Sequence, residues 1–284
     1  MWPVLIQEAI LDILEVTSYQ CRVERTSQRA PFYSLTVNGE SESERMKIDG
    51  QNVEISNRDK VFFPDTHLTK GDVIDYYVKI AGSMIPHIKH HGISMQRFPD
   101  GLKGSGFYNK DAPDYFPDWI KTVQFAKEGG GSFNAPVVDK KSSLVYLADQ
   151  AVLTFHPYWG RIDDLKHPER MIFDLDPPKD TEDFQNVRDC AQEIQDILER
   201  LDLRGWIQTT GSMGFHIHVP IIREFGFDKV REFAHDIGLL VVKANKDRYT
   251  LEEREEKRKG RVFIDFLRNS YGATSVAPYA VRAR

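Results

Sequence analysis

The chain has 284 residues, of which 40% are apolar and 29% are charged, and its formal net charge is −5. This balance is typical of a globular protein with a large core, in one domain or two, and argues against a polycation that coats nucleic acid. No apolar run approaches the roughly 18–20 residues of a membrane span, and no basic leader of a secretory signal is visible. The two cysteines are too few for a disulfide framework. We therefore expect a cytoplasmic protein.

Residues 1–49 are interpreted as an N-terminal extension. The amphipathic stretch 4–16 predicts a short helix, and the polar run 38–45 is typical of a linker or an exposed turn. From Val53 onward, the elements are more clearly delimited. We therefore predict a domain boundary between residues 49 and 50, with one main domain over 50–284.

Helix and strand signals interleave irregularly through this main domain. Thr69 is a typical helix start, and apolar residues at three-to-four spacing follow it until Pro86, which is expected to limit the helix. Residues 92–160 predict short strands and loops. The remaining predicted elements are a strand at 171–176, a long helix beginning near Phe184, strands at 206–209 and 215–221, a helix of about 15 residues after Asp228 and a last strand at 262–267. Because strands and helices do not alternate as in a doubly wound fold, the predicted fold class is α+β.

Asp174 and Asp176 are the first candidate site residues. Residues i and i+2 of a strand point to the same face, so the two carboxylates are expected to project together while Phe173 and Leu175 face a core. Two neighbouring anions repel one another unless a cation lies between them. The pattern also fits a solvated strand end, so by itself it does not decide in favour of a metal site.

A second candidate is the turn at 209–214, which contains two glycines and three hydroxyl side chains and joins two predicted strands. Small residues and free N–H groups in such a turn suit a phosphate. His216 and His218 follow on one strand face, where either imidazole can bind an anion or a metal. His216 is nearer the turn and is the better candidate, whereas His218 is expected on a polar face in water.

Asp265 is the only acid in the apolar strand at 262–267. Burying an unpaired carboxylate is costly, so Asp265 needs a partner, either Arg268 or a metal. Three carboxylates on strands, with basic and hydroxyl groups nearby, form the pattern of phosphoryl transfer with two divalent cations.

Taken together, these motifs resemble the polymerase domain of bacterial ligase D and its stand-alone relatives, members of the archaeo-eukaryotic primase superfamily. The resemblance runs from about Val53 to Arg284 and rests on several long motifs in the same order. They are Asn57–Pro64, Thr69–Asp72, Arg97–Gly101, Phe107–Lys110, Phe173–Pro177, Gly214–His216, Arg268–Asn269 and Val276–Tyr279. The resemblance implies a primase-like catalytic core over residues 50–284, with an RRM-like sheet, flanking helices and a second small sheet. Residues 1–49 match nothing in the family.

The resemblance also implies roles for individual residues. The matching acids, which would bind two divalent metal ions (manganese, or alternatively magnesium) and carry catalysis, are Asp174, Asp176 and Asp265. The residues that match nucleotide contacts are Thr210, His216, Arg268, Arg282 and Lys110. The residues that match DNA contacts are Lys60, Lys70, Arg97, Phe107 and Tyr108. Of these, the two lysines match a pocket for the 5′-phosphate of the downstream strand at a gap, and the two aromatic residues match a pair that stacks on the template base. Met213 and Tyr271 depart from the family, which usually has basic residues there.

The function implied is a template-dependent nucleotidyltransferase that fills gaps and extends ends at DNA double-strand breaks in non-homologous end joining, preferring ribonucleotides. Its expected partners are DNA with gaps or 3′ overhangs and a downstream 5′-phosphate, NTP or dNTP, and Ku and a DNA ligase. Its expected setting is the nucleoid, without a membrane. Two alternatives stay open: a primase that starts strands de novo, and a non-catalytic module that bridges DNA ends. The 5′-phosphate lysines favour repair over priming, and three mutually repelling acids argue against a site that has lost catalysis. A polymerase-beta-like transferase is disfavoured because its Gly-Ser precedes the Asp-x-Asp motif, whereas Gly211-Ser212 follows it here.

Overall fold

The computed structural model of the protein describes residues 43–127, 129–179 and 184–283. All of these residues belong to one compact unit. The predicted helix at 4–16 therefore lies outside the described residues. None of the described helices is long and apolar enough to cross a membrane.

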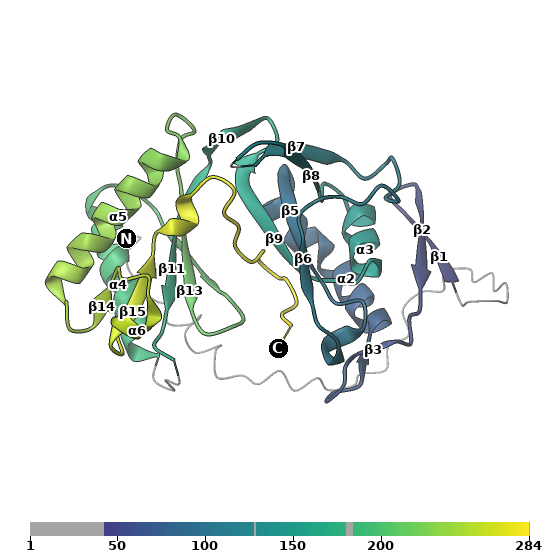
Figure 1. Cartoon of the computed structure of the whole chain (residues 1–284), viewed down its shortest axis with the longest axis horizontal. Helices are drawn as coiled ribbons and strands as arrows, with labels where there is room; N and C mark the ends of the chain where they lie inside the picture. Colours follow the sequence, from purple (N-terminus) through teal and green to yellow (C-terminus); the bar gives the residue numbers. More distant parts are fainter. Residues whose placement is uncertain (1–42, 128, 180–183, 284) are drawn as a thin grey trace, which may run out of the picture. The chain divides into compact units, whose positions relative to one another are not determined.

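A five-stranded sheet contains the strands on which the sequence predicts the acids. Its spatial order is β12-β13-β11-β15-β14, and all neighbours are antiparallel except the parallel pair β14–β15. The strands are β11 (Arg170–Asp176), β12 (Trp206–Thr209), β13 (Phe215–Pro220), β14 (Tyr249–Thr250) and β15 (Val262–Asp265). The helices α4 (Gln185–Arg200) and α5 (Phe227–Ala244) contact this sheet and lie beside β11 and β13 in Figure 1. Phe173, Leu175 and Ile264 are fully buried, on the face opposite Asp174, so the other face is left for polar groups.

A four-stranded antiparallel sheet has the order β10-β9-β5-β6. Its strands are β5 (His91–Arg97), β6 (Phe107–Asn109), β9 (Val152–Arg161) and β10 (Asp164–Pro168). The partners Met95 and Phe155 of β5 and β9 belong to a core that includes residues of α2 (Lys70–Ile88) and α3 (Lys141–Asp149); Figure 1 shows both helices beside this sheet. Because side chains alternate along a strand, Thr154 and His156 face the other way.

Among the described residues, three two-stranded hairpins and several short helices complete the fold. The hairpins are β1 (Ser43–Ile48) with β2 (Gln51–Ser56), β3 (Val61–Phe63) with β4 (Leu68–Thr69), and β7 (Thr122–Ala126) with β8 (Ser132–Pro136). The short helices are η1 (Gly101–Lys103), α6 (Glu255–Arg258) and η2 (Leu267–Asn269). The predicted boundary between residues 49 and 50 falls in the β1–β2 turn, where Asp49 and Gly50 have φ of 50° and 77°. Residues 43–45, expected in a linker, instead begin β1.

The helix predicted after Thr69 forms, but it continues past Pro86. The Thr69 hydroxyl accepts the Asp72 N–H, and the Thr69 N–H donates to the Asp72 carboxylate, which closes a capping box. At the other end, the helix runs to Ile88. Ile88 is fully buried in the core, so its packing holds the final turn in spite of the proline.

The other predicted elements lie close to their expected bounds, but several observed elements, among them β1–β4, β14 and α6, were not predicted. The sequence did not predict α3, because its buried residues lie on nearly all sides of a helix of only nine residues and leave no clear apolar stripe. The last strand ends at Asp265 rather than Leu267. The Asp265 carboxylate accepts the Leu267 N–H at 2.8 Å and turns the chain into η2.

Candidate active site

The structure brings the three predicted acids together on one face of the five-stranded sheet. Asp174 of β11 and Asp265 of β15 are direct partners in the antiparallel register. Asp176 lies two residues along β11 and therefore points to the same face as Asp174. Asp174 and Asp265 are buried and Asp176 is partly buried, so their negative charges are concentrated where water screens them poorly.

Arg268 lies between two of these carboxylates. Its Nε is 2.9 Å from Asp174 Oδ2 and 3.3 Å from Asp265 Oδ2. The next residue, Asn269, is buried and fixes η2 against β11, since its side chain accepts the Ile172 N–H and donates to the Ile172 carbonyl, both at 2.7 Å. Arg268, one of the two partners expected for Asp265, is therefore in contact with it, and the neighbouring Asn269 fixes the backbone next to Arg268.

The three carboxyl groups differ in their pKa values. Burial, and then the negative charges of Asp174 and Asp265, raise the pKa of Asp176 to about 6. Burial is also the main reason why the pKa of Asp265 is raised. For Asp174, burial is outweighed by His216 and Arg268, which hold its pKa below the ordinary value. One guanidinium thus compensates the acids only in part, and a further positive charge would favour their ionised forms.

These acids fit a divalent cation by their chemistry. Among the described residues, no group of three or more His, Cys, Asp and Glu side chains is already gathered in metal-binding geometry. The donors are nevertheless carboxylate oxygens, which Mg²⁺ and Mn²⁺ prefer. The Arg268 guanidinium, a cation, already contacts both Asp174 and Asp265. Burial and then the charges of Asp174 and Asp265 raise the pKa of Asp176, and a bound cation would offset the repulsion between these charges.

The turn between β12 and β13 lies beside the acids. His216 is the register partner of Asp174, and its Nε2 is 3.4 Å from Asp174 Oδ1. The Thr210 hydroxyl donates to the Gly214 carbonyl at 3.0 Å and accepts the Ser212 N–H at 3.3 Å, so it holds the turn closed. Gly214 is required here because a Cβ would lie 2.1 Å from the Leu175 carbonyl oxygen. His216, which the sequence favoured over His218, is thus the histidine that contacts an acid.

His218 does not face water, contrary to the expectation from the sequence. Its side chain is buried, its ring lies edge-on to Trp159 of β9 with centroids 5.6 Å apart, and neither ring nitrogen has a hydrogen-bond partner among the described residues. Burial, and then the charge of Arg170, lower the pKa of His218 to about 3. The expectation was wrong because strand alternation does not reveal that another sheet covers this polar face.

Arg282 and an unpredicted histidine, His156, belong to the same neighbourhood. Gly211 of the turn has φ of 64°, and a Cβ there would lie 2.8 Å from Arg282 Cγ, so the arginine side chain packs on the turn. Burial, and then the charges of Arg282 and Arg268, lower the pKa of His156 to about 4. The one sequence signal for His156 is a polar residue inside an aromatic strand.

The residues predicted to contact the template strand are exposed. Phe107 and Tyr108 of β6 are 47% and 57% exposed, so both rings are accessible from solvent. The Arg97 guanidinium lies 5.9 Å from the centre of the Phe107 ring and donates to the Tyr115 hydroxyl at 3.0 Å. The Tyr108 ring is 5.3 Å from that of His156, so this aromatic surface adjoins the neighbourhood of Arg282.

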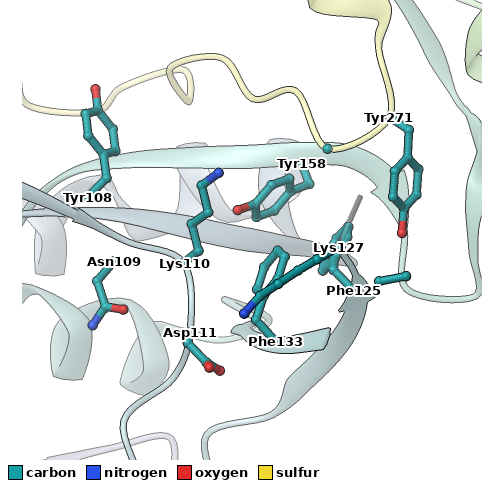
Figure 2. A pocket seen from close by; sticks show the side chains of 11 residues that line it. Tyr108, Asn109, Lys110, Asp111, Phe125, Lys127, Phe133, Tyr158 and Tyr271 are labelled. Atoms are coloured by element: carbon teal, nitrogen blue, oxygen red, sulfur yellow. The ribbon is translucent and has the colours of Figure 1, made fainter. Parts of the chain in front are cut away.

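Lys110 lines a pocket of about 530 Å³, a volume within the range of small-ligand sites. Figure 2 shows Lys110 extending toward the hydroxyl of Tyr158 across this pocket. The aromatic residues lining it are Tyr108, Phe125, Phe133, Tyr158 and Tyr271. Tyr271, where the resemblance would place a basic residue, thus contributes an aromatic side chain.

The backbones of Lys60 and Lys70 lie close together, but their ammonium groups have different environments. The Lys70 N–H donates to the Lys60 carbonyl at 2.8 Å. The Lys60 ammonium is partly exposed and pairs with Asp100 at 2.9 Å. The Lys70 ammonium is buried, 2.6 Å from Asp149 Oδ1 and within hydrogen-bond distance of the Ser56 carbonyl and hydroxyl. Lys60 therefore has an ammonium accessible from solvent, whereas that of Lys70 is engaged inside the protein.

Comparisons with known proteins agree with this arrangement. A model of the LigD primase-polymerase domain family matches residues 69–284. The chain belongs to this family. It is a nucleotidyltransferase of the polymerase and primase class. The solved structure of the polymerase domain from Mycobacterium tuberculosis ligase D, in complex with DNA, matches with a TM-score of 0.77 and 27% identity, over 82% of this chain and 83% of that one. The predicted α+β, primase-like fold is thereby confirmed.

Two curated relatives are multidomain repair proteins. The multifunctional non-homologous end joining protein LigD of Mycolicibacterium smegmatis is 30% identical over 82% of this chain and 31% of its own length. The bifunctional LigD of Bacillus subtilis is 26% identical over 81% of this chain and 37% of its own length. The chain thus spans about a third of the length of these relatives, corresponding to one of their parts.

Proposed function

We propose that this chain is a template-dependent polymerase that fills gaps and extends ends at DNA double-strand breaks in non-homologous end joining. The observation that carries the proposal is the pairing of Asp174 with Asp265 across β11 and β15, with Asp176 on the same face and Arg268 between them. Three mutually repelling acids with one guanidinium suit a site that collects divalent cations and a triphosphate. The names of the relatives support the repair setting.

The metal ligands in this proposal are Asp174, Asp176 and Asp265. Two bound cations, manganese or magnesium, would supply Lewis-acid activation of the primer 3′-hydroxyl and neutralise the triphosphate. The family implies dependence on a divalent metal, and the acids of this site suit either ion.

The nucleotide contacts in this proposal come from residues around the β12–β13 turn. His216 and Thr210 approach the triphosphate from the turn, and Arg268 and Arg282 provide guanidinium groups, whose planar fork suits phosphate oxygens. Lys110 contacts the nucleotide from the aromatic pocket. These groups stabilise the charge that develops on the leaving pyrophosphate. A ribonucleotide is the preferred substrate.

The DNA contacts in this proposal come from the four-stranded sheet and its hairpins. Phe107 and Tyr108 are exposed aromatic residues that suit stacking on a template base, and Arg97 lies beside Phe107. Lys60 is the accessible member of the 5′-phosphate pair, with Lys70 beneath it. Ku and a DNA ligase are the proposed protein partners, and the nucleoid is the proposed location.

Primer extension on a gapped duplex tests this proposal. The substrate carries either a 5′-phosphate or a 5′-hydroxyl on the downstream strand, with NTP or dNTP and with Mn²⁺ or Mg²⁺. We expect nucleotides to be added to the primer within the gap, faster with ribonucleotides. We also expect the 5′-phosphorylated duplex to bind more tightly. That preference should shrink as salt rises, since released counterions weaken every phosphate contact.

Lys60→Ala should remove the 5′-phosphate preference while extension of a simple primer continues. Lys243→Ala is the matched control, because Lys243 is an exposed lysine on α5, a helix outside the proposed DNA surface. Strand initiation on single-stranded DNA without a primer would favour the primase alternative. DNA binding without any nucleotide addition would favour the end-bridging alternative. Equal binding of the two gapped duplexes by the wild type would remove the argument for break repair.

A further inference from the structure

The segment that follows η2 is fastened along the four-stranded sheet. Residues 275–282, which we name the C-terminal strap, contain no helix or strand, yet they run beside β9, where the Ala277 N–H donates to the Phe155 carbonyl at 2.9 Å. Figure 1 shows this segment in yellow. Trp159 Nε1 donates to the Ser275 hydroxyl at 3.0 Å, and Gln208 Nε2 donates to the Val276 carbonyl at 3.1 Å. Side chains from two sheets therefore hold the first part of the strap.

The far end of the strap is held more tightly, at Val281. The Val281 N–H donates to the Tyr77 hydroxyl at 3.0 Å, and the Thr154 hydroxyl donates to the Val281 carbonyl at 2.7 Å. Tyr77 and Thr154 are fully buried. Both backbone polar groups of one residue are thus satisfied by buried side chains from α2 and β9, and the next residue is Arg282.

The fixed backbone at Val281 affects the neighbouring residue, Arg282. It lies at the end of a segment without regular structure, and its side chain packs on Gly211 in the turn that also holds Thr210. A long side chain on an unfastened backbone would lose much conformational freedom on binding a phosphate, and preorganisation reduces that cost. Fixing the backbone of the preceding residue is a direct way to reduce it.

We propose that Tyr77 and Thr154 are positioning residues that hold Arg282 in place for the incoming nucleotide by clamping Val281. Neither side chain touches substrate; each acts through the strap backbone. The inference rests on the proposed role of Arg282 as a triphosphate contact.

Thr154 offers the cleaner test, because the Tyr77 hydroxyl also donates to the Leu153 carbonyl at 2.7 Å. Thr154→Val removes the hydroxyl with little change in volume, and Thr154→Ser keeps it. Thr250→Val is the matched control: Thr250 is also buried on a strand, and its hydroxyl accepts the Glu252 N–H at 3.1 Å, away from the strap.

We expect Thr154→Val to raise the nucleotide KM about fivefold in primer extension, which corresponds to about 1 kcal/mol at 1.4 kcal/mol per factor of ten. The dissociation constant for DNA should not change. Thr154→Ser should restore a KM near that of the wild type, and Thr250→Val should leave KM unchanged even where it lowers the unfolding midpoint as much as Thr154→Val does. In an Arg282→Ala background, which itself raises KM, adding Thr154→Val should have no further effect, because nothing remains to be positioned.

Two kinds of result overturn the inference, and they are distinguishable. If Arg282→Ala leaves the nucleotide KM unchanged, the proposed role of Arg282 fails and the inference fails with it. If Arg282→Ala raises KM while Thr154→Val does not, or if Thr154→Val has the same effect with and without Arg282, the positioning role alone is refuted.

Discussion

The buried ion pair between Lys70 and Asp149 leads to a prediction about stability. Only 6% of the Lys70 side chain and 4% of the Asp149 side chain are exposed, and the two charged atoms are 2.6 Å apart. Asp149 Oδ1 also accepts the Ser56 N–H at 2.8 Å. Lys70→Met removes the ammonium and keeps an unbranched side chain of similar length, leaving the carboxylate buried without a counter-ion. Breaking a buried pair in this way costs about 3–5 kcal/mol, a large part of the roughly 5–15 kcal/mol that stabilises a typical domain.

Urea denaturation followed by circular dichroism measures this cost. For a domain of this size, with an m-value of about 3 kcal/mol per M, the midpoint of Lys70→Met should fall by about 1–1.7 M. The double variant Lys70→Met, Asp149→Asn should be more stable than Lys70→Met alone, because it removes the uncompensated charge and keeps an acceptor for the Ser56 N–H. Lys60→Ala should change the free energy of unfolding by less than about 1 kcal/mol, since its partner Asp100 is a surface residue.

A Lys70→Met midpoint within about 0.3 M of the wild type would refute the reasoning, and so would a double variant less stable than the single one. The prediction also bears on the 5′-phosphate proposal. If removal of Lys70 unfolds part of the domain, a lost phosphate preference in that variant reports folding rather than recognition. Lys60 is therefore the residue with which the phosphate contact is tested.

Three further predictions concern the acid cluster and its neighbours. Asp265→Ala should abolish nucleotide addition while the circular dichroism spectrum and DNA affinity stay near those of the wild type, because a metal ligand is lost but charge repulsion is relieved; extension at a near-normal rate with Mn²⁺ would contradict the polymerase assignment. His216→Ala should raise the nucleotide KM and lower kcat in steady-state extension, whereas His218→Ala should affect both much less, and the reverse order would show that the functional histidine has been misidentified. Because the pKa of Asp176 is raised to about 6, its carboxyl group is mostly protonated at pH 5 and must lose that proton to bind a metal. The Mn²⁺ affinity measured by calorimetry should therefore rise from pH 5 to pH 7.5, with proton release at the lower pH. A pH-independent affinity would contradict this assignment.

The sequence by itself determined the local placement of the chemistry. The two-residue period of a strand puts Asp174 and Asp176 on one face, and the Thr69 cap, the long apolar stripe before residue 201 and the glycine-rich turn each depend on neighbours a few positions away. Such short-range rules do not require knowledge of the rest of the fold. For the same reason they could not find α3, whose residues are buried on most sides and lack a stripe.

The tertiary structure alone decided which of these groups meet and which are exposed. The Arg268–Asp174 contact spans 94 positions, Lys70–Asp149 spans 79 and Val281–Tyr77 spans 204, so no local pattern records them. His218 was expected in water, and no local pattern indicates that the Lys70 ammonium is buried, because burial depends on what another element places over a residue. The environment of a polar side chain is a property of its distant neighbours, whereas its direction along a strand or helix is a property of the local backbone.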